Sequence, residues 1–185
     1  MNRYRDVLRN GDYCTAKALP MRLLVAVGES ERALPAVRYV GSLLQCTPEV
    51  LVTLFHVLKP MPRGLLEHGG SENPDMEAEL SSRLREDQEA WIKQEREAHC
   101  QTLERAQGLL MRAGFDESRV ALKFGHEDNI ANAILDEARN GHHDTIVVGR
   151  SGMSGTTRLF NSGITEHLLR DARGLVIWII TPSQR

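Results

Sequence analysis

The chain has 185 residues and a mass of 20.8 kDa, which is the size of one globular domain. Hydrophobic residues make up 41% of it and charged residues 26%, which excludes collagen-like, coiled-coil and wholly disordered chains. The formal net charge is −2 and aromatic residues are only 5%, so the chain offers neither a basic surface for phosphate backbones nor a stacking platform for bases. We therefore expect no nucleic acid partner.

We expect neither a membrane-spanning segment nor a secretory signal in this sequence. Its longest nearly apolar run, from Leu175 to Ile180, is far shorter than the roughly 20 residues that a membrane-spanning helix needs. Residues 1–20 mix acidic and basic side chains without the apolar segment of a secretory signal. The three cysteines, Cys14, Cys46 and Cys100, have no CxxC spacing and are interpreted as free thiols. These features predict a cytoplasmic protein with no membrane partner.

Short apolar runs alternate with helical patterns along the chain. The apolar runs, which show little internal alternation and therefore predict strands buried on both faces, are residues 22–27, 50–57, 120–124, 145–148 and 175–180. The helical patterns between them are a helix capped by Ser30, a charged segment at about 75–113, and helices over 130–138 and 164–172. This order predicts an α/β fold with a doubly wound parallel sheet over residues 21–185, preceded by a tail over residues 1–20.

The segment at about 75–113 is strongly charged. It predicts one long helix, or two in sequence, with Leu80, Leu84 and Trp91 on one face. Between Glu72 and Arg105 there are ten acidic and five basic residues, a net charge of −5. Two interpretations stay open, a solvated outer face with charge pairs and a docking surface for a basic protein partner.

Ligands of open parallel sheets bind beyond the carboxyl ends of the strands, where the strand order reverses. That rule selects the loops that begin at Gly28, Lys59 and Gly149. The loop from Gly149 to Arg158 is rich in small residues and contains two arginines, Arg150 and Arg158. A helix start follows at Ser162-Gly163. Small residues and helix N-termini let backbone amides approach an anion, so this loop predicts a phosphate cradle, although a connection without a ligand is the alternative. It matches neither a Walker A loop nor a Rossmann fingerprint.

Several segments in order resemble the universal stress protein family, over roughly residues 21 to 181. The resemblance rests on Arg22-Leu-Leu-Val-Ala-Val27, Leu54-Phe-His-Val57, the Gly125 loop, Asp144-Thr-Ile-Val-Val-Gly149-Arg-Ser-Gly152, and Ile164-Thr-Glu-His-Leu-Leu169 before the last strand. It implies five parallel strands sandwiched by helices, a fold of the adenine nucleotide alpha-hydrolase-like kind. It also implies a homodimer through the last strand and membership of either the ATP-binding or the non-binding branch.

The nucleotide motif of the resembled family is only partly present. ATP-binding members have Gly, two residues, Gly, nine residues, and then Gly with Ser or Thr. Gly149 and Gly152 match this pattern, but its closing pair stands reversed as Ser162-Gly163, with Thr165 as an alternative source of a hydroxyl. Gly28 occupies the position just after the first strand where the family usually has an aspartate for adenine. The departures therefore fall at both ends of the expected ligand.

We predict a site for an adenine nucleotide, ATP or AMP, with Mg or Mn entering only through the phosphates. Its predicted residues are Ala26, Val27, Gly28, Val57, Val148, Gly149, Arg150, Ser151, Gly152, Ser162, Gly163, Ile164 and Thr165. No residue looks like a poised general base, so we predict no catalytic residues and at most slow ATP hydrolysis. The expected role is a stress-response sensor or regulator. The alternative is a nucleotide-independent dimeric protein-interaction module with a degenerate ATP site.

The run from Leu175 to Ile180 would be hazardous as an exposed sheet edge, because consecutive apolar residues there would promote aggregation. Something is expected to cover it. An edge-to-edge homodimer would pair its backbone groups, and the chain's own tail over residues 1–20 is the alternative cover.

The histidines show no metal-binding spacing, and we predict no intrinsic metal site. His142 and His143 are expected on the surface, in an exposed turn. His56 is expected to line the core or the cleft without binding a metal. His167 is expected to form a solvent-facing pair with Glu166.

Overall fold

The computed structural model describes residues 20–28, 34–47, 49–66, 73–126, 129–149 and 163–181. The predicted tail, apart from Pro20, and the predicted helix cap at Ser30 lie outside the described residues. The division into tail and domain therefore stays a prediction.

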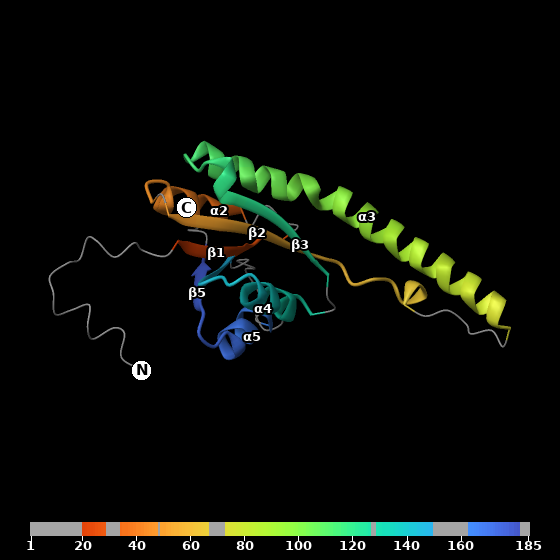
Figure 1. The fold of residues 1–185 in the computed structure, drawn as a ribbon. Helices are drawn as coiled ribbons and strands as arrows, with labels where there is room; N and C mark the ends of the chain where they lie inside the picture. Colours follow the sequence, from red (N-terminus) through yellow and green to blue (C-terminus); the bar gives the residue numbers. More distant parts are fainter. Residues whose placement is uncertain are drawn as a thin grey trace, which may run out of the picture.

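Five strands form one parallel sheet, as the sequence predicted (Figure 1). They are β1 (Met21–Ala26), β2 (Val50–Leu58), β3 (Val120–His126), β4 (Thr145–Gly149) and β5 (Val176–Ile180). Their spatial order is β3-β2-β1-β4-β5, and every neighbouring pair is parallel. The chain therefore starts the sheet in its middle and adds strands first on one side and then on the other.

In the described ranges, four α-helices cover the two faces of the sheet. They are α2 (Leu34–Leu44), α3 (Pro74–Arg112), α4 (Ile130–Asn140) and α5 (Gly163–Asp171). One core cluster joins α2 and α3 to Leu23 and Val25 of β1, and the other joins α4 and α5 to Leu24 of the same strand. Successive side chains of β1 thus enter opposite cores, which explains why its sequence is apolar at consecutive positions.

The charged segment forms a single helix rather than two. Asn73 caps α3 by accepting a hydrogen bond from the Asp75 amide, and Pro74 begins the helix, where its missing N–H costs nothing. The helix ends before Gly114, whose φ of 101° is one that glycine adopts readily. No helix within the described ranges combines the length and apolarity needed to cross a bilayer.

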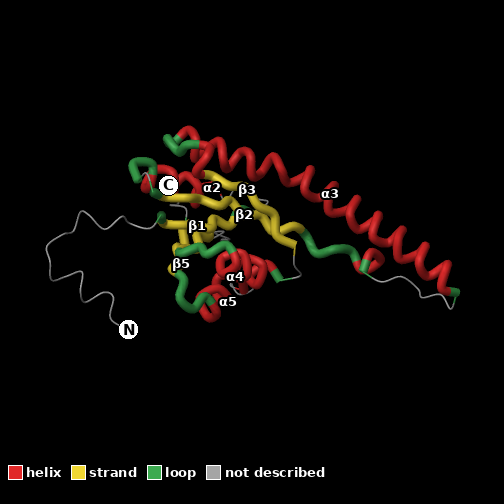
Figure 2. Tube along the Cα trace, viewed as in Figure 1, coloured by secondary structure: helices red, strands yellow, loops and turns green. Residues whose placement is uncertain are grey.

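Much of α3 lies away from the core, and Figure 2 shows its first part extending past the end of the sheet. With 39 residues at about 1.5 Å per residue, α3 is about 58 Å long, roughly twice the length of the nine-residue β2. Its buried residues are confined to its last part and are Leu103, Ala106 and Leu110. There α2 approaches closely, because a side chain at Gly41 would lie 2.9 Å from the Cβ of Ala113. The last third of α3 therefore anchors the whole helix.

The prediction that His143 lies on the surface is wrong. His142 is exposed, but its φ of 52° turns the chain so that the next side chain enters the protein, where His143 is only 6% exposed. The His143 Nδ1–H donates to the Glu137 carbonyl at 3.2 Å, and Nε2 accepts from the Thr53 hydroxyl at 3.0 Å. Burial lowers the pKa of His143 below its ordinary value of 6.5, so the ring is held neutral.

This burial predicts a loss of stability in acid. Because the folded-state pKa is depressed, the contribution of neutral His143 is complete above pH 6.5 and is lost as the pH falls below it. The slope is at most about 1.4 kcal/mol per pH unit for one proton. Denaturant unfolding at pH 7.5 and 5.5 should show a smaller pH dependence in His143→Gln than in the wild type. His142→Asn, which suits the positive φ, is the control and should keep the wild-type dependence.

Candidate functional site

The carboxyl ends of β1 and β4 mark the point where the sheet reverses its direction of growth. They are neighbours, with Ala26 opposite Val148 in the register. In the chain, β1 is followed by α2 on one face of the sheet, whereas β4 is followed by α5 on the other. Open α/β sheets usually bind their ligands in a crevice beyond the carboxyl ends of the strands at such a point.

The structure places the predicted strand residues at this edge but on different faces. Ala26, Val57 and Val148 belong to the core on the side of α4 and α5, whereas Val27 belongs to the core on the side of α2 and α3. Val27 and Val148 are buried. A ligand beyond this edge would therefore meet mainly backbone groups and glycine here.

Both backbone polar groups of Val27, its N–H and its carbonyl, form hydrogen bonds with β2. Its N–H donates to the Phe55 carbonyl at 2.8 Å. Its carbonyl accepts from Nδ1 of His56 at 2.7 Å, and the His56 ring is 2% exposed. The prediction that His56 lines the core is confirmed, and the structure adds a contact to the candidate edge that sequence spacing alone does not reveal.

Two glycines leave open space at the edge. A Cβ built at Gly28 or at Gly163 would meet no atom within 4 Å, and neither residue has a left-handed backbone conformation. Gly28, Gly163 and Ile164 are exposed, and Thr165 is half-buried. Glycine at position 28 is therefore not required by the fold, and a side chain there could reach a ligand.

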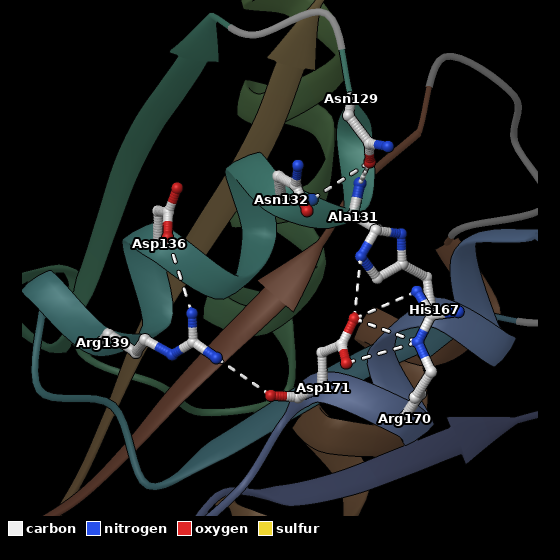
Figure 3. Close-up of polar contacts among 8 residues, drawn as sticks. All are labelled: Asn129, Ala131, Asn132, Asp136, Arg139, His167, Arg170 and Asp171. Atoms are coloured by element: carbon white, nitrogen blue, oxygen red, sulfur yellow. Dashed lines mark hydrogen bonds and ion pairs between the residues drawn. The ribbon is translucent and has the colours of Figure 1, made fainter.

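The direction of α5 follows from its contacts with α4, shown in Figure 3. Arg139, in the last turn of α4, donates from Nη2 to the carbonyl of Asp171, the last residue of α5, at 2.9 Å. The end of α4 leads into the start of β4, so the C-terminus of α5 lies near the amino ends of the strands. Its N-terminus at Gly163 is therefore directed toward the carboxyl edge, where its unpaired amides would favour an anion.

The predicted pair between His167 and Glu166 is not observed. His167 instead contacts Asp171 one turn later, with 3.1 Å between Nε2 and Oδ2 (Figure 3). Arg170 binds the same carboxylate, and that hydrogen bond lowers the pKa of Asp171. A spacing of four along a helix places His167 and Asp171 on the same face. These contacts organise the end of α5 rather than the candidate site.

Asp144, part of the motif that carries the family resemblance, lies at the opposite end of β4 from the candidate site. Its carboxylate accepts from the Arg22 amide at 2.8 Å, and its own amide donates to the Arg22 carbonyl at 2.8 Å. Its carbonyl accepts from the Val176 amide at 2.9 Å. Asp144 thus aligns the starts of β1, β4 and β5, which is a structural role.

Arg150, Ser151, Gly152 and Ser162 lie outside the described residues, so their assignment to a phosphate cradle stays a prediction. Within the described part of the chain, no group of three or more histidine, cysteine or carboxylate side chains could hold a metal ion. A cavity of about 180 Å³ lies elsewhere, between β3 and α4, and is lined by Phe55, Phe124, Gly125, His126, Ala133, Asp136, Glu137 and Asn140. It does not extend to the edge of β1 and β4.

A parallel sheet with this strand order, covered by helices on both faces, defines a doubly wound α/β protein. The model of the "Universal stress protein family" matches residues 21–177, and the chain belongs to this family. No curated protein matches the chain significantly.

Solved structures share the fold at low sequence identity. A universal stress protein in complex with cAMP has 15% identity and a TM-score of 0.58, with 90% of this chain and 100% of that chain covered. The universal stress protein UspA from Lactobacillus plantarum has 16% identity and a TM-score of 0.57, covering 90% and 99%. A family member from Burkholderia pseudomallei has 20% identity and a TM-score of 0.53, covering 89% and 98%. At these identities the similarity establishes the fold alone.

Proposed function

We propose that this universal stress protein binds an adenine nucleotide, ATP or AMP, at the carboxyl edge between β1 and β4. The observation that carries the proposal is the point between β1 and β4 where the sheet reverses its direction of growth, with open space at Gly28 and the N-terminus of α5 at Gly163. The adenine would lie toward β1 and β2, and the phosphates toward the segment that joins β4 to α5. A structure of the same fold is a complex with the nucleotide cAMP, which supports a nucleotide as the ligand class.

The proposed role is that of a sensor or regulator in the stress response rather than of a fast enzyme. The described residues at the carboxyl ends of β1 and β4 are Ala26, Val27, Gly28, Val148 and Gly149. None of these five has a side chain able to act as a general base. Arg150 and Ser162 would contribute to phosphate binding, and Mg or Mn would enter only with the phosphates. Hydrolysis of bound ATP is expected to be slow.

Equilibrium titration of extensively dialysed protein with labelled ATP, and separately with AMP, tests the proposal. We expect saturable binding with one nucleotide per chain. Absence of binding for both nucleotides at millimolar concentration would reject it.

Restoring an acidic side chain after β1 should strengthen binding. In Gly28→Asp, the new carboxylate has open space and would accept a hydrogen bond from the adenine amino group. A hydrogen bond to a charged group contributes about 1.5 kcal/mol, which predicts about a tenfold lower Kd for ATP. Gly28→Ala adds a side chain without an acceptor and should leave the affinity near that of the wild type. Equal affinity in Gly28→Asp and Gly28→Ala would place the adenine elsewhere.

We also propose a homodimer through β5, the edge strand next to β4. In the single chain, Val176 and Ile179 are 53% and 39% exposed, and Ile177, Trp178 and Ile180 are only partly buried. An apolar edge strand with unpaired backbone groups is a template for pairing with a second strand. A second copy would cover these side chains and pair the edge.

A second candidate function is a protein-interaction module that needs no nucleotide. It is favoured by α3, in which no residue before Leu103 is buried and in which Glu86, Asp87 and Glu89 are exposed. This surface would suit a basic protein partner. The candidate predicts a dimer that forms without nucleotide and a chain that binds neither ATP nor AMP. Micromolar binding of either nucleotide would favour the first function instead.

A further inference from the structure

A buried histidine connects the candidate nucleotide edge to the long helix. His56 lies in β2, is 2% exposed and has Nδ1 at 2.7 Å from the Val27 carbonyl oxygen. Because a carbonyl can only accept, the proton of this hydrogen bond is on Nδ1. Val27 is the first residue after β1 and immediately precedes Gly28. The imidazole therefore holds the backbone at the point where the chain leaves the sheet and enters the proposed site.

Two further rings, from β3 and α3, contact the His56 ring. Phe124 of β3 meets it edge-on, with centroids 6.1 Å apart and an interplanar angle of 87°. His99 of α3 lies over it with centroids 4.7 Å apart and an angle of 30°. Nε2 of His99 is 3.4 Å from Oε2 of Glu95, one turn earlier in the same helix, and the two side chains are 13% and 19% exposed. The ring is thus oriented by groups from three elements.

His99 occupies a distinctive place on α3. It lies one turn before Leu103, the first buried residue of this helix, and so belongs to the turn where α3 begins to leave the core. The helix contributes many exposed residues before this turn and the core contacts after it. A change in how this part of α3 is held would alter the position of His99 and, through the contact between the two rings, that of His56.

We propose that His56 is a positioning residue for the nucleotide site and that His99 couples its orientation to the docking of α3. The hydrogen bond to Val27 sets the backbone that faces the adenine, and the stacked His99 ring keeps the imidazole aligned with that carbonyl. Nucleotide affinity therefore depends on a helix that contributes no residue to the predicted site. This inference rests on the proposed nucleotide binding but gives a role to two residues that are not among the predicted nucleotide-binding residues.

Two substitutions at His56 separate positioning from packing. In His56→Leu, the donor to Val27 is lost while a side chain of similar size stays in the core. In His56→Asn, the side-chain amide can donate in place of Nδ1. We expect the Kd for ATP, measured on folded protein well below Tm, to rise about tenfold in His56→Leu and to stay within about threefold of the wild type in His56→Asn. Loss of stability without this difference in affinity would mean that His56 only packs.

A double-mutant cycle tests the coupling to α3. His99→Ala should weaken ATP binding about threefold, and adding it to His56→Leu should cause little further loss, because both changes act through the same hydrogen bond. Gln94→Ala, at an exposed position of α3, is the matched control and should bind like the wild type. Additive losses, or an unchanged affinity in His99→Ala, would show that α3 is not coupled to the site through His56.

Hydrogen exchange without nucleotide distinguishes failure of this inference from failure of the proposed function. Amides of residues 25–28 should exchange faster in His56→Leu than in His56→Asn. If neither ATP nor AMP binds the wild type, the proposed function and the role of His56 in it both fall, whereas a retained exchange difference would still show that His56 holds the end of β1. If nucleotide binds and the two variants match in affinity and exchange, only the inference is overturned.

Discussion

Gly152→Val is expected to raise the Kd for ATP about a hundredfold or more while leaving the homodimer intact. Gly152 is the second matching glycine of the family motif, where the proposed site needs the backbone to approach the phosphates closely. A valine side chain would separate the amides from the phosphate oxygens and leave charged oxygens without donors. Equilibrium titration measures the affinity, and sedimentation velocity measures the dimer.

Gly155→Val in the same segment is the control for this substitution, because Gly155 does not match a motif position. It should bind ATP within a few-fold of the wild type. Wild-type affinity in Gly152→Val would move the phosphates away from this segment. A loss of equal size in both variants would indicate a general effect on the loop.

Lysines at the exposed apolar positions of β5 are expected to dissociate the dimer. In Val176→Lys/Ile179→Lys, positive charges would enter an apolar interface and meet the same charges of the second copy. Burying unpaired charges costs several kcal/mol, so the dimer Kd should rise about a hundredfold or more. Sedimentation equilibrium over a range of protein concentrations measures this change.

Leu169→Lys introduces the same charge at a residue of α5 that is 60% exposed, and it should leave the dimer unchanged. A dimer that persists in the β5 variant would place the interface elsewhere on the chain. A monomeric wild type would instead favour the alternative in which the N-terminal tail covers β5.

The fold was predictable because its signals are local. Each strand is an apolar run long enough to cross the sheet and is bounded by glycine, proline or polar residues, so its limits agree with the structure within about two residues. The periodicity of the helices predicted α4 and α5 in the same way. For the candidate site, the rule that ligands bind at the carboxyl edge selected three loops, which begin at Gly28, Lys59 and Gly149, and the site residues themselves stay a prediction.

The errors arose where a side chain's surroundings depend on the turn or on a distant partner. His142 and His143 follow Asn140-Gly141 and come just before a strand, a pattern that favours exposure, but the positive φ of His142 directs His143 inward to Thr53. The sequence predicts that His167 pairs with Glu166, but the turn of the helix brings His167 to Asp171 instead. The choice between one helix and two was open for α3, because an exposed charged helix carries little periodic signal.

The sequence by itself determined which segments are strands and helices, their parallel arrangement and the likeness to universal stress proteins, because backbone propensity and apolar patterning act over neighbouring residues. Only the tertiary structure decided that β1 lies between β2 and β4, that α5 directs its N-terminus to the carboxyl edge, and that His56 joins Val27 to α3. Those features depend on contacts between residues far apart in the chain, which packing of the two cores creates and no local pattern encodes.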